Sequence, residues 1–214
     1  MNENNLKSIK IPKKDENLAE FVGLMLGDGN IYSNKKRGVY QIKVTNNSVT
    51  DKEYIYNFVK PLIENLFGVN TYINFEKNRK GVNIRAGSMN LIKFLYSIGL
   101  KPGNKIKNNL DIPNWIKTKN NLLIPCIRGL FDTDGTVYYQ TRQRKNLVIG
   151  FKNSNKLLLK TVRESLIKLK FHPTKIIINA IFITRRAEVK QFNEKISFNN
   201  PKHKMKFIQY SPVV

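Results

Sequence analysis

Hydrophobic and polar positions follow two different periods along the chain. Residues 18–28 carry apolar side chains at helical spacing and are followed by Gly29, a residue that suits the left-handed end of a helix. Residues 39–45 alternate strictly instead, with Tyr40, Ile42 and Val44 on one face. The start of the chain therefore predicts a helix followed by a half-buried strand.

The same two periods recur to the end of the chain. We expect helices over 50–68, 88–100, about 122–134, about 154–170 and about 186–197, and strands over 71–76, 81–87, 136–140, 146–151, 175–179 and 181–185. Pro61 should kink or divide its helix because it lacks the N–H that an interior turn needs. Each half then has the order helix, two strands, helix, two strands, helix, which predicts an α+β fold of two pseudo-symmetric αββαββα units.

A break in the pattern separates these two units. Residues 101–120 contain two prolines and keep no sustained period, which is typical of a connecting segment. We therefore divide the chain into an N-terminal extension (1–17), a first repeat (18–104), a linker (105–121) and a second repeat (122–214).

The first helix of each unit ends in a related stretch, GLMLGDG at 23–29 and GLFDTDG at 129–135. Gly23 and Gly27 stand one turn apart, and so do Gly129 and Thr133. Small residues at this spacing allow another backbone to approach closely. We expect the two helices to pack on each other and to join the two halves.

That packing would bring Asp28 and Asp134 together at the carboxyl ends of the two helices. Two carboxylates repel each other there, and the helix dipoles add to the negative potential, so at least one acid is protonated unless a cation lies between them. One Asp-Gly after a helix is usually only a turn, but two copies in the same context favour a site. Oxygen ligands of this kind suit Mg²⁺.

Charge indicates what such a site would act on. The chain has 38 Lys and Arg against 15 Asp and Glu, a formal net charge of +23. The excess is spread over both halves, which favours a nucleic-acid partner, with an anionic membrane surface as the lesser alternative. A metal between two acids on a basic protein points to phosphodiester chemistry.

Cysteine usage and hydropathy exclude other classes. Cys126 is the single cysteine, so an intramolecular disulfide framework and a Cys-rich zinc site are both excluded. No segment reaches the roughly 20 apolar residues of a membrane span. We expect an intracellular protein that is not secreted and has no membrane partner.

The two stretches resemble the paired motifs of LAGLIDADG homing endonucleases in their single-chain form, because Gly, Leu, Asp and Gly stand at motif positions three, four, eight and nine of both. The resemblance covers nearly the whole chain and implies antiparallel sheets that form a DNA-binding saddle. It also implies a monomeric, intron-associated, site-specific endonuclease that cuts both strands of a long asymmetric DNA site.

The resemblance further implies roles for individual residues. Asp28 and Asp134 would bind the metal and be catalytic, with the carbonyls of Gly27 and Thr133 as further ligands. The metal would be Mg²⁺, for which Ca²⁺ or Mn²⁺ can substitute in the site. Lys105 and Lys204 are the candidates for the basic residue beside each acid, while Asp132 has no acidic counterpart in the first motif and is assigned to structure.

Polar side chains on the outer faces of the strands are the candidates for base contacts, because antiparallel ribbons fit the major groove. In the first repeat they are Tyr32, Asn34, Arg37, Gln41, Lys43, Thr45, Asn46, Tyr72, Asn74, Glu76, Asn83 and Arg85. In the second they are Tyr138, Gln140, Arg142, Arg144, Lys152, Asn153, Lys175, Asn179 and Arg185. By the same resemblance, Asn46 and Asn153, at the ends of corresponding strands, would also reach water at the metal site.

Two alternatives use the same scaffold without DNA cleavage. One is a maturase that binds intron RNA, and the other is a DNA-binding protein that has lost catalysis. Retention of an acid in both motifs favours the endonuclease.

Overall fold

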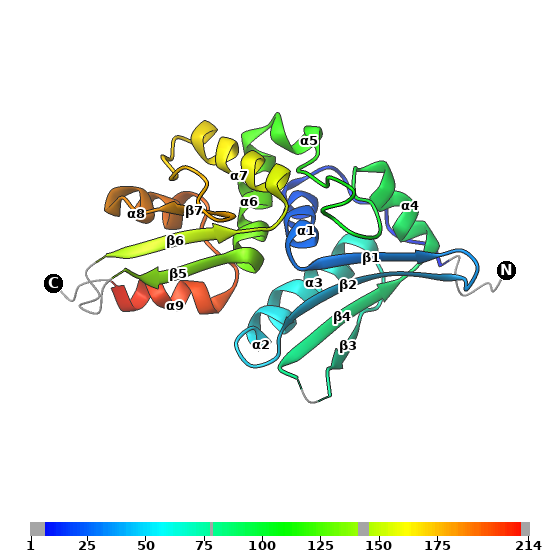
Figure 1. Ribbon diagram of the computed structural model, residues 1–214. Helices are drawn as coiled ribbons and strands as arrows, with labels where there is room; N and C mark the ends of the chain where they lie inside the picture. The colour runs from blue at the N-terminus through cyan, green and yellow to red at the C-terminus, as the bar shows by residue number, and fades with distance from the viewer. Residues whose placement is uncertain (1–6, 78, 141–145, 211–214) are drawn as a thin grey trace.

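The first half of the chain forms one four-stranded sheet with helices against it (Figure 1). The structure is a computed structural model and describes residues 7–77, 79–140 and 146–210. The elements follow in the order α1 (Glu16–Gly27), β1 (Gly29–Asn34), β2 (Val39–Asn47), α2 (Lys52–Tyr54), a π-helix (Ile55–Val59), α3 (Lys60–Phe67), β3 (Tyr72–Phe75), β4 (Gly81–Gly87) and α4 (Met89–Ser97).

The second half repeats this order with fewer strands. After the short α5 (Asn114–Lys117) come α6 (Asn120–Asp134), β5 (Gly135–Tyr139), β6 (Leu147–Lys152), α7 (Lys156–Lys168), β7 (Ala180–Ile183), α8 (Arg186–Lys195) and α9 (Pro201–Tyr210). The strands are antiparallel in both sheets, in the orders β1-β2-β4-β3 and β5-β6-β7. The predicted α+β fold of two related units is confirmed.

Helices α1 and α6 pack against each other between the two sheets (Figure 1). The packing is close because glycine faces backbone on both sides. A Cβ at Gly23 would overlap the carbonyl oxygen of Cys126, and one at Gly129 would overlap that of Glu20. The small residues of the two motifs thus join the halves, as their spacing predicts.

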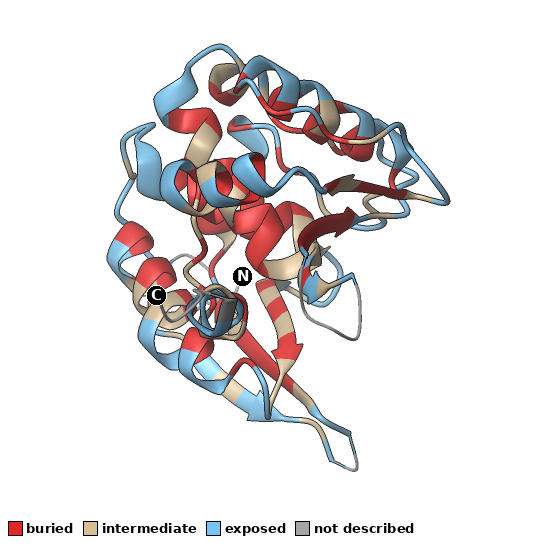
Figure 2. Cartoon of the chain, turned by 90° about the vertical axis from the view of Figure 1, so that its left-hand side faces the viewer, coloured by how far each residue is buried: buried red, intermediate tan, exposed pale blue. Residues whose placement is uncertain are grey.

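The core runs from this helix pair into both sheets (Figure 2). Phe21 and Phe67 meet edge to face in the first half, with ring centroids 5.0 Å apart. Phe131 contacts Phe151 and Phe192 in the second, at 5.1 and 5.0 Å. Each half has its own aromatic cluster, so each can position one motif.

The helix expected over 50–68 runs without a break from Lys52 to Phe67, but its α-helical hydrogen bonding changes to a π-turn before Pro61. The N–H of Lys60 reaches back five residues to the carbonyl of Ile55 instead of four. A proline ring clashes with the carbonyl four residues before it and offers no N–H. The wider π-turn in front of Pro61 accommodates both effects.

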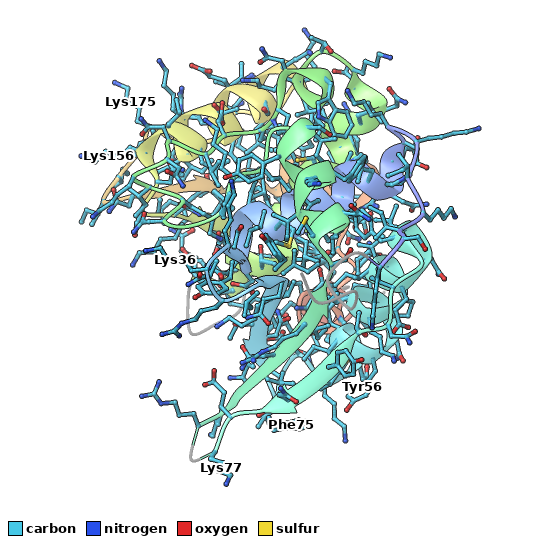
Figure 3. All side chains as sticks on the ribbon, turned by 90° about the vertical axis from the view of Figure 1, so that its right-hand side faces the viewer. Lys36, Tyr56, Phe75, Lys77, Lys156 and Lys175 are labelled. Carbon is cyan, nitrogen blue, oxygen red and sulfur yellow. The ribbon has the colours of Figure 1, made fainter. Side chains whose placement is uncertain are left out.

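Three expectations about elements are wrong. Residues 175–179 form no strand but one bridge, between Ile177 and Ala180, and a turn. The segment after α8 forms α9, which its mixed pattern did not predict, and α5 lies inside the expected linker. Phe75 lies opposite the buried Val82 and so shares its face of the sheet, but it is 57% exposed, since β3 extends beyond the helices (Figure 3). Within the described residues, no helix has the length and apolarity that crossing a bilayer requires.

Candidate active site

The motif acids end the two central helices. Asp28 caps α1, its N–H bonding to the carbonyl of Leu24, and Asp134 is the last residue of α6. Gly27 lies against Thr133, and the position of a Cβ at Gly27 is 3.5 Å from Asp134 Oδ2. The two carboxyl groups therefore lie at one place, at the base of the helix interface.

Each acid accepts a hydrogen bond from an asparagine at the end of the second strand of its own half. Asn46 Nδ2 donates to Asp28 Oδ2 at 3.2 Å, and Asn153 Nδ2 donates to Asp134 Oδ2 at 2.7 Å. Both amides thus hold their carboxylates in place, and the site has the same local symmetry as the fold.

Burial and mutual repulsion act on both acids. Burial, followed by the charge of Asp134, raises the pKa of Asp28 to about 7, against the opposing effects of Lys105 and Lys202. Burial also raises the pKa of Asp134, while the hydrogen bond from Asn153 and the charge of Lys105 lower it. Ionisation of both neighbouring carboxyl groups is unfavourable here, and a nearby positive charge would stabilise their ionised forms.

Lys105 supplies one such charge within the protein. Its Nζ donates to the carbonyls of Leu26 at 3.0 Å and Met25 at 3.4 Å, and also to that of Gly27. Burial lowers its pKa, and both acids oppose that effect. The ammonium thus caps the carboxyl end of α1 within reach of both acids.

A cavity of about 280 Å³ opens beside the pair and is lined by Gly27, Lys105, Asp134, Lys152 and Asn153, among others. Asn46 Oδ1 is buried, and none of the described residues hydrogen-bonds to it. Within the same residues, no group of three or more His, Cys, Asp and Glu is arranged to hold a metal. The donor set of two carboxylates and nearby carbonyls fits a hard divalent cation completed by water.

The two expected carbonyl ligands differ in their surroundings. The carbonyl of Gly27 already accepts from Lys105. Thr133 turns its hydroxyl back along α6, where it donates to the carbonyls of Gly129 at 3.1 Å and Leu130 at 2.9 Å. A cation that used the carbonyl of Gly27 would have to compete with the lysine.

The role of Lys204 as the second basic residue stays a prediction, and the structure adds Lys202 as a further candidate. Lys204 is exposed on α9, and its charge acts on Glu20. Lys202 pairs with Asp51 at 2.8 Å, and its charge lowers the pKa of Asp28. The sequence offered both lysines in PKHKMK, and only the unforeseen helix α9 decides which of them turns inward.

A buried polar network ties the second half to the first, and it includes Asp132, which the sequence assigned to structure. Asp132 is fully buried and accepts the backbone N–H groups of Asn199 and Asn200, each at 3.0 Å. Asn200 Nδ2 reaches across to Asp51 at 2.8 Å, and Arg128 pairs with Glu20 at 3.0 Å. These contacts fix the start of α9 against the helix interface.

Most of the expected base-reading side chains of the first half share one face by register, but Asn46 pairs with the buried Val82 and lies on the opposite face. Residues opposite each other in a sheet point the same way, and the pairs are Tyr32–Gln41, Lys43–Arg85, Thr45–Asn83, Tyr72–Arg85 and Asn74–Asn83. In the turn after β1, Asn34 Oδ1 accepts a hydrogen bond from the backbone N–H of Arg37 at 3.0 Å. This face continues from the site along the whole sheet.

Two of these residues are not free for a ligand. Asn83 is only 4% exposed, accepts from Thr45 Oγ1 at 2.7 Å and donates to Glu76 at 3.1 Å. Asn46 is 7% exposed and bonds Asp28. Asn83 therefore orients Thr45 and Glu76, and the expectation that it contacts bases directly is wrong.

The second half is less uniform. Four of its expected side chains are exposed: Tyr138, Gln140, Lys152 and Lys175. Arg185 is the N-cap residue of α8 and pairs with Glu188 at 3.1 Å. Asn179 lies in the turn before β7, and its carbonyl accepts the N–H of Asn153 at 3.0 Å. Arg142 and Arg144 lie outside the described residues. Figure 3 shows Lys175 on the same side of the molecule as Lys36, from the turn between β1 and β2.

Comparison with known proteins bears on both halves. Residues 123–197 match the family model of the LAGLIDADG-like domain. An uncharacterized protein, MJ0398 of Methanocaldococcus jannaschii, is 29% identical over 174 residues, which are 80% of this chain. The aligned part is 55% of that relative, so the chain spans about half of its length.

Solved structures of similar fold cover nearly the whole chain. I-DmoI in complex with DNA and Mn has a TM-score of 0.58 and 22% identity over 86% of this chain and 98% of its own. I-WcaI, a homing endonuclease bound to its DNA recognition sequence, has a TM-score of 0.62 and 16% identity over 92% of this chain and 87% of its own. The N-terminal LAGLIDADG domain of DUF199/WhiA has a TM-score of 0.55 and 17% identity over 87% of this chain and 84% of its own. Residues 123–197 thus match a LAGLIDADG-like domain, and over both halves the chain shares its fold with these solved structures.

Proposed function

We propose that this protein is a site-specific, divalent-metal-dependent endonuclease that cuts both strands of duplex DNA. The observation that carries the proposal is the meeting of Asp28 and Asp134, one from each repeat, at the base of the helix interface. Each acid is held by its own asparagine, and the pair is embedded in a protein of net charge +23. Paired carboxylates beside a polyanion-binding surface suit phosphodiester hydrolysis.

The residues of the site have separate tasks in this proposal. Asp28 and Asp134 hold the metal, which when bound polarises the phosphate and lowers the pKa of water. Asn46 and Asn153 keep the two carboxylates in position through their hydrogen bonds of 3.2 and 2.7 Å. The ammonium of Lys105 offsets negative charge at the acids and can stabilise the charge that develops on the scissile phosphate.

DNA would lie across the two sheets. The aligned polar face of the first sheet offers Gln41, Lys43 and Arg85 to base edges in the major groove. Since the two halves differ in sequence, the site they read together would be asymmetric, and one chain would suffice to cut both strands. The structures of I-DmoI and I-WcaI, both in complexes with DNA, support the same class of partner.

A second candidate is a DNA-binding protein of this fold that does not cut. The contact of Lys105 with the carbonyl of Gly27 favours it, because the lysine occupies a group that was expected to be a metal ligand. In that case Lys105 would serve as a permanent counter-ion for the two acids.

The test is a cleavage selection on plasmids that carry a randomised duplex insert, with Mg²⁺ or with EDTA. We expect metal-dependent linear products that share one asymmetric sequence. Asp28→Asn and Asp134→Asn should abolish cutting while Ca²⁺-supported binding to the recovered site persists. Asp15→Asn is the matched control at the other end of α1, because asparagine caps a helix as well as aspartate does.

The outcomes separate the two candidates. Tight, sequence-specific binding without cleavage in Mg²⁺ or Mn²⁺ would establish the non-cutting protein. Absence of any specific DNA binding would refute both.

A further inference from the structure

Three consecutive isoleucines form an exposed tip in the second half. Ile176, Ile177 and Ile178 are 44%, 54% and 85% exposed. They lie in the segment that was expected to be a strand and that forms a turn before β7 instead. Such a run of large apolar side chains gains nothing from water, so burial in the folded chain does not explain it.

The backbone does not explain Ile178 either. The turn is closed by two hydrogen bonds of 2.9 Å between Ile177 and Ala180, and both central residues have positive φ, 44° at Ile178 and 62° at Asn179. Two-residue hairpin turns of this type prefer Asn, Asp or Gly at both positions. A β-branched side chain is disfavoured there, so Ile178 is present at a cost to stability.

The tip lies next to the motif acids. The carbonyl of Asn179 accepts the N–H of Asn153 at 3.0 Å, and the side chain of Asn153 donates to Asp134 at 2.7 Å. Asn179, which follows Ile178 in the turn, therefore contacts the residue whose side chain holds Asp134.

Register places Ile177 on the outer face of the second sheet. Ala180 lies opposite both Lys152 and Ile177, so all three share a face. Lys152 lines the cavity beside Asp134. Ile177 thus faces the same side as a cation of the candidate site.

This part of the outer face has few polar groups. Gly150 pairs with Thr136 and Phe182, and a Cβ at Gly150 would come within 3.1 Å of the ring of Phe182. Val148 lies opposite Tyr138. The first sheet presents Lys43, Thr45 and Arg85 at the corresponding face, whereas the second presents apolar and aromatic groups between its exposed lysines.

We propose that Ile177 and Ile178 contact thymine methyl groups in the major groove beside the cleavage centre and so determine specificity in the half-site bound by the second repeat. The C5-methyl group of thymine is the apolar group on the major-groove edge of a base pair. The proposal rests on the proposed function, since it takes the sheets to lie in that groove.

Charge favours DNA over a protein partner at this tip. Residues 136–214 carry 17 basic and 3 acidic side chains. Lys152 and Lys175, both exposed, flank the isoleucines along the chain and across the sheet. An apolar tip between lysines and next to phosphate chemistry suits a base edge between two phosphate backbones.

The test compares Ile178→Asn with Ile178→Val on the site recovered by the cleavage selection. Asparagine accepts positive φ, so Ile178→Asn should keep or raise the midpoint of thermal unfolding while removing the apolar contact. Ile11→Asn is the matched control, because Ile11 is 65% exposed and lies beside α3 on the N-terminal segment. Affinity is measured by fluorescence anisotropy in Ca²⁺ over a range of salt concentrations.

We expect Ile178→Asn to bind about tenfold more weakly with an unchanged salt slope, because no phosphate contact is lost. Ile178→Val should retain most of the affinity, and Ile11→Asn all of it. Replacing thymine by uracil in the second half-site should weaken the wild type about fourfold per lost methyl contact and leave Ile178→Asn unaffected.

Two results would overturn this inference while the proposed function stands. One is a wild type that cuts DNA together with an Ile178→Asn variant of equal affinity, which would point to a protein partner for the tip. The other is a wild type whose affinity does not change when uracil replaces thymine, even though Ile178→Asn binds more weakly, which would exclude the methyl contact. A wild type that binds no specific DNA would instead refute the proposed function.

Discussion

Replacing Gly129 by alanine should push the two central helices apart. A Cβ at this position would overlap the carbonyl oxygen of Glu20 and lie 2.9 Å from the amide nitrogen of Leu24. Both atoms belong to the backbone of α1, so no change of rotamer relieves the overlap. The helices must separate locally, and the positions of Asp28 and Asp134 shift with them.

The expected cost follows from two opposing effects. Overpacking costs about 1–3 kcal/mol, and the upper end applies because the overlap is with backbone. A gap of roughly 1 Å also forfeits a quarter to a half of the dispersion energy of each affected contact. Alanine has a higher helix propensity than glycine by about 1 kcal/mol. The net change is a destabilisation of about 2 kcal/mol.

The assay is urea unfolding followed by far-UV circular dichroism. Asn65→Ala is the control, since it changes helix propensity at an exposed position of α3 without touching the interface. Gly129→Ala should lower the midpoint and Asn65→Ala should leave it unchanged or raise it slightly. Cleavage by Gly129→Ala should fall together with stability.

Close helix packing and helix propensity predict stability changes of opposite sign for Gly129→Ala. If propensity alone governed position 129, the alanine variant would be more stable by about 1 kcal/mol. A variant as stable as the wild type, or more stable, would refute the close packing of α1 and α6 as the element that joins the halves.

Three further predictions concern single side chains. Lys105→Met should slow cleavage about a hundredfold in single-turnover assays while DNA affinity in Ca²⁺ changes far less, because the lost donor acts on developing charge; equal losses in both would assign Lys105 to binding. Burial lowers the pKa of His203 to about 4 from 6.5, so the unfolded chain binds the extra proton between these values and stability falls as pH drops through them, by up to about 3 kcal/mol. Urea curves of His203→Gln should lack that component, and an identical pH dependence would contradict it. Asp132→Ala should destabilise the protein by about 3 kcal/mol in the same assay, since it leaves the N–H groups of Asn199 and Asn200 without an acceptor; a change below about 0.5 kcal/mol would show that water replaces it.

Sequence periodicity predicted the first half better than the second. In the first, strict alternation over 39–45 and 81–87 placed apolar residues on the core face, and the register of β2 with β4 aligns the polar ones. In the second, residues 175–185 are apolar on both faces, and period alone does not separate a strand from a turn there. The exposure of Phe75 has a different reason, because alternation gives the face of a side chain but not whether a helix extends far enough to cover it.

The residues of the candidate site also differ in how far the sequence predicted them. Both acids and both asparagines were found from the sequence, because the repeat places them at equivalent points of two copies of one unit. Lys105 was found as a basic residue late in its repeat, but its contact with the carbonyls of α1 spans 78 to 80 residues of chain. Lys202 was missed in favour of Lys204 because its position depends on α9.

The sequence by itself determined the repeated unit, the helix pair and the acids at its base. These follow from local patterns: a 3.6-residue period, small residues one turn apart and an Asp at the helix end each act within a few residues. Only the tertiary structure decided which lysines face the acids, that Asp132 holds the start of α9, and that the turn of Ile178 and Asn179 lies beside Asn153. Those contacts join residues from 26 positions apart, Asn153 and Asn179, to 151, Asp51 and Lys202, and spacing along the chain carries no record of them.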